Sequence, residues 1–156
     1  MLAAEVEDDA VATRVALVSC VRTKRTSSVA AKDMYISPLF MGMRRYAEQN
    51  ADAWFILSAE HGVLPPDQVI APYERTLKTM PNLDRVAWAT RVQRQLLELL
   101  PAGAEIVVLA GDRYREGVIP FLENHGFMVE VPMVGLKFGL QLRWLKEQTC
   151  DERSTH

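Results

Sequence analysis

The sequence predicts an α/β fold of three layers, in which a short, mainly parallel four-stranded sheet lies between two layers of helices. Two features of the 156 residues lead to this prediction. Apolar runs of strand length alternate with longer segments of helical periodicity, which is the order of elements in a parallel sheet. The run at 104–110 is almost continuously apolar, as expected of a strand that helices cover on both faces.

Four segments are predicted as strands, at residues 14–20, 53–58, 104–110 and 127–131. Four others have apolar residues three and four apart and are predicted as helices, at residues 38–50, 82–100, 112–126 and 135–148. Ser37 and Pro38 are typical of a helix start. The core stripe of the second helix is predicted to be Val86, Ala89, Val92, Leu96 and Leu99.

The connections carry fewer signals. The proline-rich segment 63–72 is expected to be an irregular loop, and such long loops in small domains are usually functional. A short turn or helix is expected at 73–78. One α/β domain at 13–149 accounts for the length, with a flexible acidic arm at 1–12 and a tail at 150–156.

Several classes of protein are disfavoured by composition. No apolar run approaches the roughly 20 residues that span a bilayer, and the N-terminus lacks a signal-peptide pattern. The two cysteines do not make a disulfide framework. The three histidines show no metal-ligand spacing, and no nucleotide-cofactor motif is present. We therefore expect a cytoplasmic monomer without membrane contact, metal or cofactor.

Charge is unevenly distributed along the chain. The net charge is −2, but residues 13–46 carry seven basic side chains against one acid, so this segment has a charge of +6. The basic residues are Arg14, Arg22, Lys24, Arg25, Lys32, Arg44 and Arg45, and the acid is Asp33. Such a surface suits phosphate. A solvated face is the alternative interpretation.

The loop after the first strand contains Asp33-Met-Tyr35. Ligands of open α/β sheets bind beyond the carboxyl ends of the strands, so this loop is placed for chemistry. A carboxylate there can orient a water or stabilise a sugar cation, and glycosidic cleavage needs such a group. Tyr35 could stack on a base. The alternative is that Asp33 only caps the turn before Ser37.

The second strand leads directly into Glu60-His61-Gly62. A second acid and an imidazole thereby reach the same edge of the sheet. His61 could donate a proton to a leaving base or contact a phosphate, and Gly62 permits close backbone approach. A hydrogen-bonded loop histidine is the alternative.

Arg113 and Arg115 are predicted in the first turn of the helix at 112–126. Cations at that position oppose the helix macrodipole, and a bound phosphate would reverse the cost. Tyr114 between them offers a stacking face. Alternatively, the two arginines pair with Glu116 and Asp112.

The last group is Gly135-x-x-x-Gly139 with Gln141. These glycines indicate either tight packing on the sheet or a ligand near the helix start, and the Gln141 amide suits the edge of a base. Cys20, close to Lys24, could be a nucleophile, but a buried core cysteine is the favoured interpretation.

Three motifs resemble known proteins. They are Ser19-Cys20-x-x-x-Lys24, Ser58-Ala-Glu-His-Gly-Val-Leu-Pro65 and Pro72-Tyr73-x-x-Thr76-Leu77. These motifs are similar to those of a bacterial domain family and of the archaeosine synthase core, which acts on a 7-deazaguanine base in transfer RNA and resembles the uracil-DNA glycosylase superfamily. The chain also resembles antiphage DNA glycosylases that excise glucosylated hydroxymethylcytosine. The resemblance covers about residues 15–145.

The resemblance implies a uracil-DNA-glycosylase-like fold and a set of site residues. Asp33-Met-Tyr35 resembles the water-activating loop, although the late histidine-proline-serine motif is absent. Asp33 is the implied catalytic acid with Glu60 as its rival, and His61 would act on the departing base. Together, the residue patterns described above and the resemblance give the substrate-binding set Ser19, Cys20, Lys24, Arg25, Tyr35, Tyr73, Glu74, Tyr114, Arg115, Gly135 and Gln141.

The function expected from these observations is a monofunctional DNA N-glycosylase that leaves an abasic site at a modified base, in defence against phage. The target nucleotide would flip out of the DNA into a pocket beyond the strand ends. One alternative is a base-modifying transferase acting on a deazaguanine-type nucleotide in RNA or DNA. A second is a nucleic-acid-binding module without catalysis.

Overall fold

The structure is a computed structural model, in which residues 13–20, 24–74 and 76–149 are described. The predicted acidic arm at 1–12, the tail at 150–156 and Arg22 of the basic segment lie outside the described residues.

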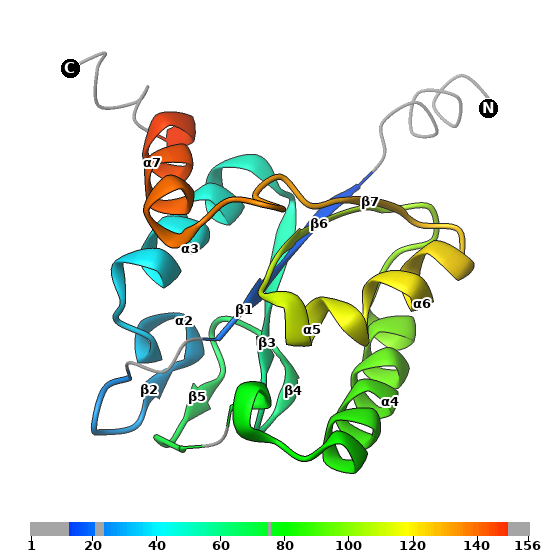
Figure 1. Ribbon diagram of the computed structural model, residues 1–156, viewed down its shortest axis with the longest axis horizontal. Helices are drawn as coiled ribbons and strands as arrows, with labels where there is room; N and C mark the ends of the chain where they lie inside the picture. The colour runs from blue at the N-terminus through cyan, green and yellow to red at the C-terminus, as the bar shows by residue number, and fades with distance from the viewer. Residues whose placement is uncertain (1–12, 21–23, 75, 150–156) are drawn as a thin grey trace, which may run out of the picture.

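A five-stranded sheet forms the centre of the described domain (Figure 1). Its strands are β1 (Arg14–Ser19), β3 (Ala53–Ser58), β4 (Gly62–Leu64), β6 (Glu105–Leu109) and β7 (Met128–Glu130). The spatial order is β4-β3-β1-β6-β7, and all but β4 are parallel. The prediction of a mainly parallel sheet is therefore confirmed. The predicted number of four strands is wrong, because the sheet has five.

The additional strand, β4, comes from the segment that was expected to be irregular. The chain reverses after β3 in a tight turn, where the Ser58 Oγ accepts the backbone N–H groups of Glu60 and His61 at 3.2 and 3.0 Å. Gly62 follows with φ 77°, a conformation that favours glycine. β4 can then pair antiparallel with β3, because a turn this short suits only antiparallel strands.

A second, two-stranded sheet also lies in segments expected to be loops. β2 (Val29–Ala30) pairs antiparallel with β5 (Val69–Ile70). An isolated bridge joins Lys24 to Tyr35 in the loop after β1. The loops that follow β1 and β4 are thus tied to each other.

Helices cover both faces of the sheet (Figure 1). On one face lie α3 (Pro38–Asn50) and α7 (Phe138–Thr149), and on the other lie α4 (Asn82–Leu99), α5 (Asp112–Glu116) and α6 (Ile119–Asn124). Two short helices, α2 (Ala31–Met34) and η1 (Leu77–Thr79), lie in the connections. The side chains of β1 alternate between the two cores, with Ala16 and Val18 in one and Val15 and Leu17 in the other.

The predicted boundaries of α3 are confirmed, and Ser37 caps its start by accepting the Phe40 N–H at 3.1 Å. The predicted helix at 112–126 is wrong, because it is divided into α5 and α6. Pro120 has no N–H to donate back to Glu116, so a continuous helix would lose a hydrogen bond there. At this break Gly117 lies against α4, and its carbonyl accepts from Gln93 at 2.9 Å.

The last helix begins at Phe138 and not at Gly135. Gly135 has φ 82°, which is outside the helical region. Among the described helices, none combines the length and apolar composition needed to cross a membrane.

Candidate functional site

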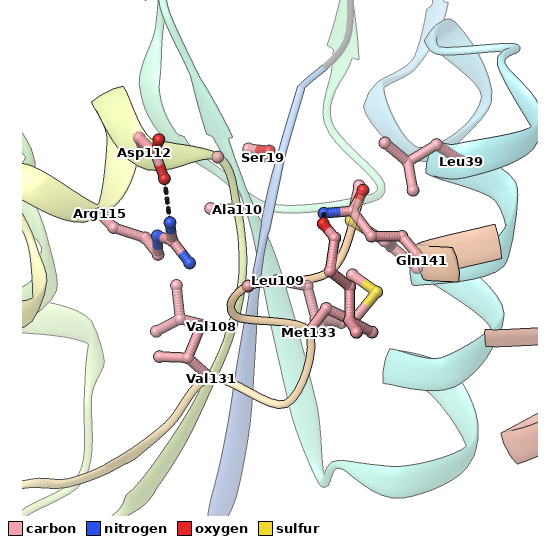
Figure 2. Close-up of a pocket in the computed structure, with 14 residues that line it drawn as sticks. Ser19, Leu39, Val108, Leu109, Ala110, Asp112, Arg115, Val131, Met133 and Gln141 are labelled. Atoms are coloured by element: carbon pink, nitrogen blue, oxygen red, sulfur yellow. Dashed lines mark hydrogen bonds and ion pairs between the residues drawn. The ribbon is translucent and has the colours of Figure 1, made fainter. Parts of the chain in front are cut away.

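A cavity of about 430 Å³ opens at the carboxyl ends of β1, β6 and β7 (Figure 2). Ser19 ends β1, and Ala110 follows the end of β6, which is its neighbour in the sheet. The strand order reverses between β1 and β6, where ligands of open α/β sheets bind. The cavity is lined by Ser19, Leu39, Met43, Val108, Leu109, Ala110, Gly111, Asp112, Arg115, Val131, Met133, Gly135, Leu136 and Gln141.

One side of the cavity is charged. Asp112 begins α5, and its carboxylate forms an ion pair with Arg115 one turn later. The Arg115 side chain is 21% exposed, whereas that of Asp112 is 80% exposed and lies at the rim. Figure 2 shows the Arg115 guanidinium pointing toward Asp112. Gln141 lies on the opposite side of the strand ends from this pair.

The other side of the cavity combines an amide with apolar walls. The Gln141 Nε2 donates to the Leu136 carbonyl at 3.1 Å, which fixes the orientation of the amide. Leu39, Met43 and Met133 supply aliphatic and thioether surface around it. Among the described lining residues none is aromatic, so a ring bound here would pack between flexible, polarizable side chains.

Ser19 forms the polar floor between these two sides. Only 6% of Ser19 is exposed, although the residue lines the cavity. A serine hydroxyl at this place can donate a hydrogen bond to a ligand in the cavity or accept one from it.

Four residues of the predicted substrate-binding set therefore meet at one cavity: Ser19, Arg115, Gly135 and Gln141. Gly135 contributes the turn that carries the chain from β7 past the cavity to α7. These four come from three different segments, and their approach depends on the sheet order.

Four further residues of the predicted substrate-binding set, Cys20, Tyr35, Tyr73 and Tyr114, lie together with Ser58 in what we call the tyrosine cluster. The Ser58 Oγ donates to the Tyr73 hydroxyl at 2.8 Å, and the hydroxyls of Tyr73 and Tyr35 are 2.5 Å apart. The Cys20 Sγ lies 3.0 Å from the Tyr114 hydroxyl. Burial, reinforced by the nearby Cys20, raises the pKa of all three tyrosines, so these hydroxyls stay neutral.

Lys24 and His61 border the tyrosine cluster. The Lys24 Nζ lies 4.7 Å from the centroid of the Tyr73 ring, and the His61 ring meets the Tyr73 ring edge-on at 5.5 Å. Cys20 and Tyr114 are the chain neighbours of Ser19 and Arg115, so the cluster adjoins the cavity. Glu74 and Arg25 are exposed, and the Arg25 Nε donates to the Asp33 carbonyl at 2.9 Å.

The three predicted catalytic side chains do not line the cavity within the described residues. Asp33 is exposed on α2, and its carboxylate pairs with Arg44 of α3 at 2.9 Å. Glu60 lies in the turn after β3, where its carbonyl accepts from Arg91 at 3.0 Å. A catalytic role for Asp33, Glu60 or His61 stays a prediction.

The basic segment carries less free charge than its sequence indicates. Lys32 pairs with Asp67 at 2.8 Å, and this hydrogen bond is the main cause that raises the pKa of Lys32. Arg44 pairs with Asp33 and Glu48, and Arg14 with Glu130. Acids outside the segment, together with its own Asp33, thus pair with Arg14, Lys32 and Arg44.

The expected position of Arg113 and Arg115 at a helix start is wrong in one respect. Because α5 is only five residues long, both arginines also belong to its last turn, where cations are favoured. Arg113 pairs with Glu116 at 3.8 Å, and Arg115 pairs with Asp112, as the alternative interpretation had it. The helix macrodipole therefore gives no reason to expect a phosphate at Arg115. The reason that remains is that Arg115 lines the cavity.

Asp112 is the polar lining residue that the sequence reasoning missed. Its position directly after the third strand was a signal, because strand ends meet at the functional edge. The apolar residues of the cavity wall could not be recognised in the sequence, because residues such as Met43 follow the same pattern as residues of the hydrophobic core. No group of three or more His, Cys, Asp or Glu that could hold a metal ion occurs among the described residues.

Comparison with known proteins identifies the family. Residues 15–147 match the model of a family of unknown function, DUF6884, and the chain belongs to this family. It is also 34% identical over 99 residues to the uncharacterized protein YfjM of Bacillus subtilis (strain 168). That match covers 62% of this chain and 65% of YfjM, so the chain spans slightly less than two thirds of this relative.

Proposed function

We propose that this DUF6884 member is a DNA N-glycosylase that hydrolyses the N-glycosidic bond of a modified base, such as the glucosylated hydroxymethylcytosine of phage DNA. The observation that carries the proposal is the cavity at the β1–β6 strand ends, with an acid–guanidinium pair on one side and an amide on the other. Its volume of about 430 Å³ lies within the range of small-molecule sites.

The two sides of the cavity suit the two parts of a nucleotide. The apolar walls and the Gln141 amide match a base, whose faces are apolar and whose edge carries donors and acceptors. The Ser19 hydroxyl lies between them and can bond the same edge. Arg115 matches the phosphate, because a guanidinium binds phosphate oxygens through two parallel hydrogen bonds. A nucleotide flipped out of DNA would therefore lie with its sugar near Asp112.

Asp112 is the carboxylate that we assign to the chemistry. As the C1′–N bond lengthens, positive charge develops on the sugar, and a nearby carboxylate stabilises it. A water oxygen then bonds to C1′ and gives one proton to Asp112, from which it passes to solvent. The electron pair of the broken bond stays on the base nitrogen, which takes up a proton from water.

Asp112 is preferred over Asp33 and Glu60 because it alone of the three lines the cavity among the described residues. The Asp33 carboxylate pairs with Arg44 of α3, and neither of these two residues lines the cavity among the described residues.

The resemblance of the motifs to DNA glycosylases favours cleavage over binding alone. The helices on both faces of the parallel sheet are compatible with the uracil-DNA-glycosylase-like fold that this resemblance implies, and we include that finer fold in the proposal. A cytoplasmic monomer acting on incoming phage DNA would fit this role.

The test is incubation with unmodified and glucosylated phage DNA, followed by alkaline cleavage and mass spectrometry. We expect strand breaks at abasic sites and a free modified base from the phage DNA alone. A nucleotide of altered mass without a free base would instead identify a transferase. Binding without either product would identify a nucleic-acid-binding module.

A further inference from the structure

The two charged side chains of the cavity hold each other. Asp112 and Arg115 both line it, and their ion pair closes across one turn of α5. In the protein without substrate, the guanidinium that would bind phosphate is engaged by the carboxylate that would act on the sugar. Neither group is available while the pair is closed.

We infer that a phosphate of the nucleic-acid strand displaces Asp112 from Arg115 and thereby releases the carboxylate for the reaction. The site would then act on nucleotides within a strand and leave free nucleosides intact. The catalytic consequence rests on the proposed function, whereas the exchange of partners at Arg115 does not.

The exposure of the two side chains decides which one moves. Arg115 is 21% exposed and Asp112 is 80% exposed, so Asp112 can turn into water without leaving a buried charge. An exposed pair three residues apart is weak, because water screens it and both side chains lose freedom. A phosphate offers the guanidinium two oxygens in a matching geometry, which favours the exchange.

Contacts of Tyr114 anchor α5 beside the cavity. Tyr114, between the two charged residues, bonds the Cys20 Sγ at 3.0 Å through its hydroxyl. Its ring also meets Trp88 edge-on at 5.5 Å. The exchange therefore requires side-chain rotation only.

The chain provides a matched control on the same helix. Arg113 and Glu116 form an ion pair with the same spacing, at 3.8 Å, and neither residue lines the cavity among the described residues. Removing the Glu116 charge changes the net charge by the same amount as removing the Asp112 charge. It leaves the cavity unchanged.

The experiment is a double-mutant cycle on the affinity for oligothymidylate at low salt. Asp112→Asn should tighten binding about two- to fivefold, because binding to Arg115 no longer has to break a weak, exposed ion pair. Arg115→Gln should weaken binding, and Asp112→Asn should then have no effect in the Arg115→Gln background. Glu116→Gln should change affinity less than Asp112→Asn does.

The exchange would be overturned if Asp112→Asn changed the affinity equally in the wild-type and Arg115→Gln proteins. It would also be overturned if Glu116→Gln tightened binding as much as Asp112→Asn does. This cycle does not depend on base release. If the cycle shows coupling but no DNA loses a base, the exchange stands and the glycosylase function fails. If bases are released but the cycle is additive, the function stands and the exchange fails.

Discussion

Two neighbouring regions share the carboxyl edge of the sheet, and they use polar groups in opposite ways. In the tyrosine cluster, the Tyr35, Tyr73 and Ser58 hydroxyls bond one another, and burial keeps the two tyrosines neutral. In the cavity, by contrast, Ser19 and the ion pair of Asp112 and Arg115 line an open space, and Asp112 is largely exposed at its rim. Polar groups that bond one another in the interior fix loops, whereas polar groups that line a cavity can exchange their partners for a ligand.

The largest effect should come from the cavity carboxylate. We expect Asp112→Asn to lower the rate of base release by about a hundredfold or more, since it keeps the shape and removes the charge. Asp33→Asn and Glu60→Gln are the controls, and both should stay near the wild-type rate in a quantitative abasic-site assay. Loss of base release in Asp33→Asn with normal release in Asp112→Asn would return catalysis to the loop after β1.

The tyrosine cluster should respond in stability and not in turnover. Tyr73→Phe removes the hydroxyl that joins Ser58 to Tyr35, so we expect the free energy of unfolding to fall by about 1–3 kcal/mol. Urea denaturation measures this loss, and base release per folded molecule should stay unchanged. A hundredfold slower release from a fully folded Tyr73→Phe protein would place the cluster in the reaction.

The same cluster predicts a loss of stability at alkaline pH. Burial raises the folded-state pKa of Tyr35, Tyr73 and Tyr114 above the ordinary value of about 10. The unfolded chain therefore loses these protons first, and stability present below about pH 10 is lost as pH rises further, by about 1.4 kcal/mol per pH unit for each tyrosine. Tyr114→Phe should make the fall shallower by one such contribution. An unchanged slope would contradict this account.

The smallest effect should come from the outer basic segment. Lys32→Ala removes an exposed cation already paired with Asp67, so we expect little loss of stability and no change in the salt dependence of DNA binding. Arg115→Gln should reduce the slope of log affinity against log salt by about one. A reduced slope in the Lys32 variant would extend the interface to that segment.

Four of the five strands could be predicted from the sequence because they are apolar runs with local signals, and β4 was missed because it lies in a segment that resembles a loop. The helix α3 was equally predictable, since Ser37 and Pro38 mark its start. The core stripe of α4 was predicted only in part. Val92 and Leu96 are buried as expected, but Val86 and Leu99 are exposed and the unpredicted Trp88 is buried. Trp88 lies four residues before Val92 and eight before Leu96, so the three side chains share one face of the helix. Burying the large Trp88 ring favours this face over the one that carries Val86 and Leu99.

The site was predictable only in part. Ser19 ends one strand and Arg115 closely follows another, and the carboxyl ends of parallel strands meet at the same edge of the sheet. A parallel sheet is therefore enough to predict that these two residues lie near each other. Ion pairs between distant segments, such as Lys32 with Asp67, depend on loop conformations that no local pattern specifies. The role of Asp33 was judged from its neighbours in the chain, and its actual partner is Arg44, eleven residues away on α3.

The location of the bound nucleotide is the central claim, and methionine-methyl NMR tests it most directly. Met43 and Met133 line the cavity, whereas Met34 is fully buried outside the cavity lining and Met80 lies in the other core, against α4. On titration of the methyl-labelled Asp112→Asn protein with a short strand of glucosylated DNA, we expect the Met43 and Met133 signals to shift and those of Met34 and Met80 to stay. Shifts at Met34 with unchanged Met43 and Met133 would contradict the account and place the nucleotide outside the cavity.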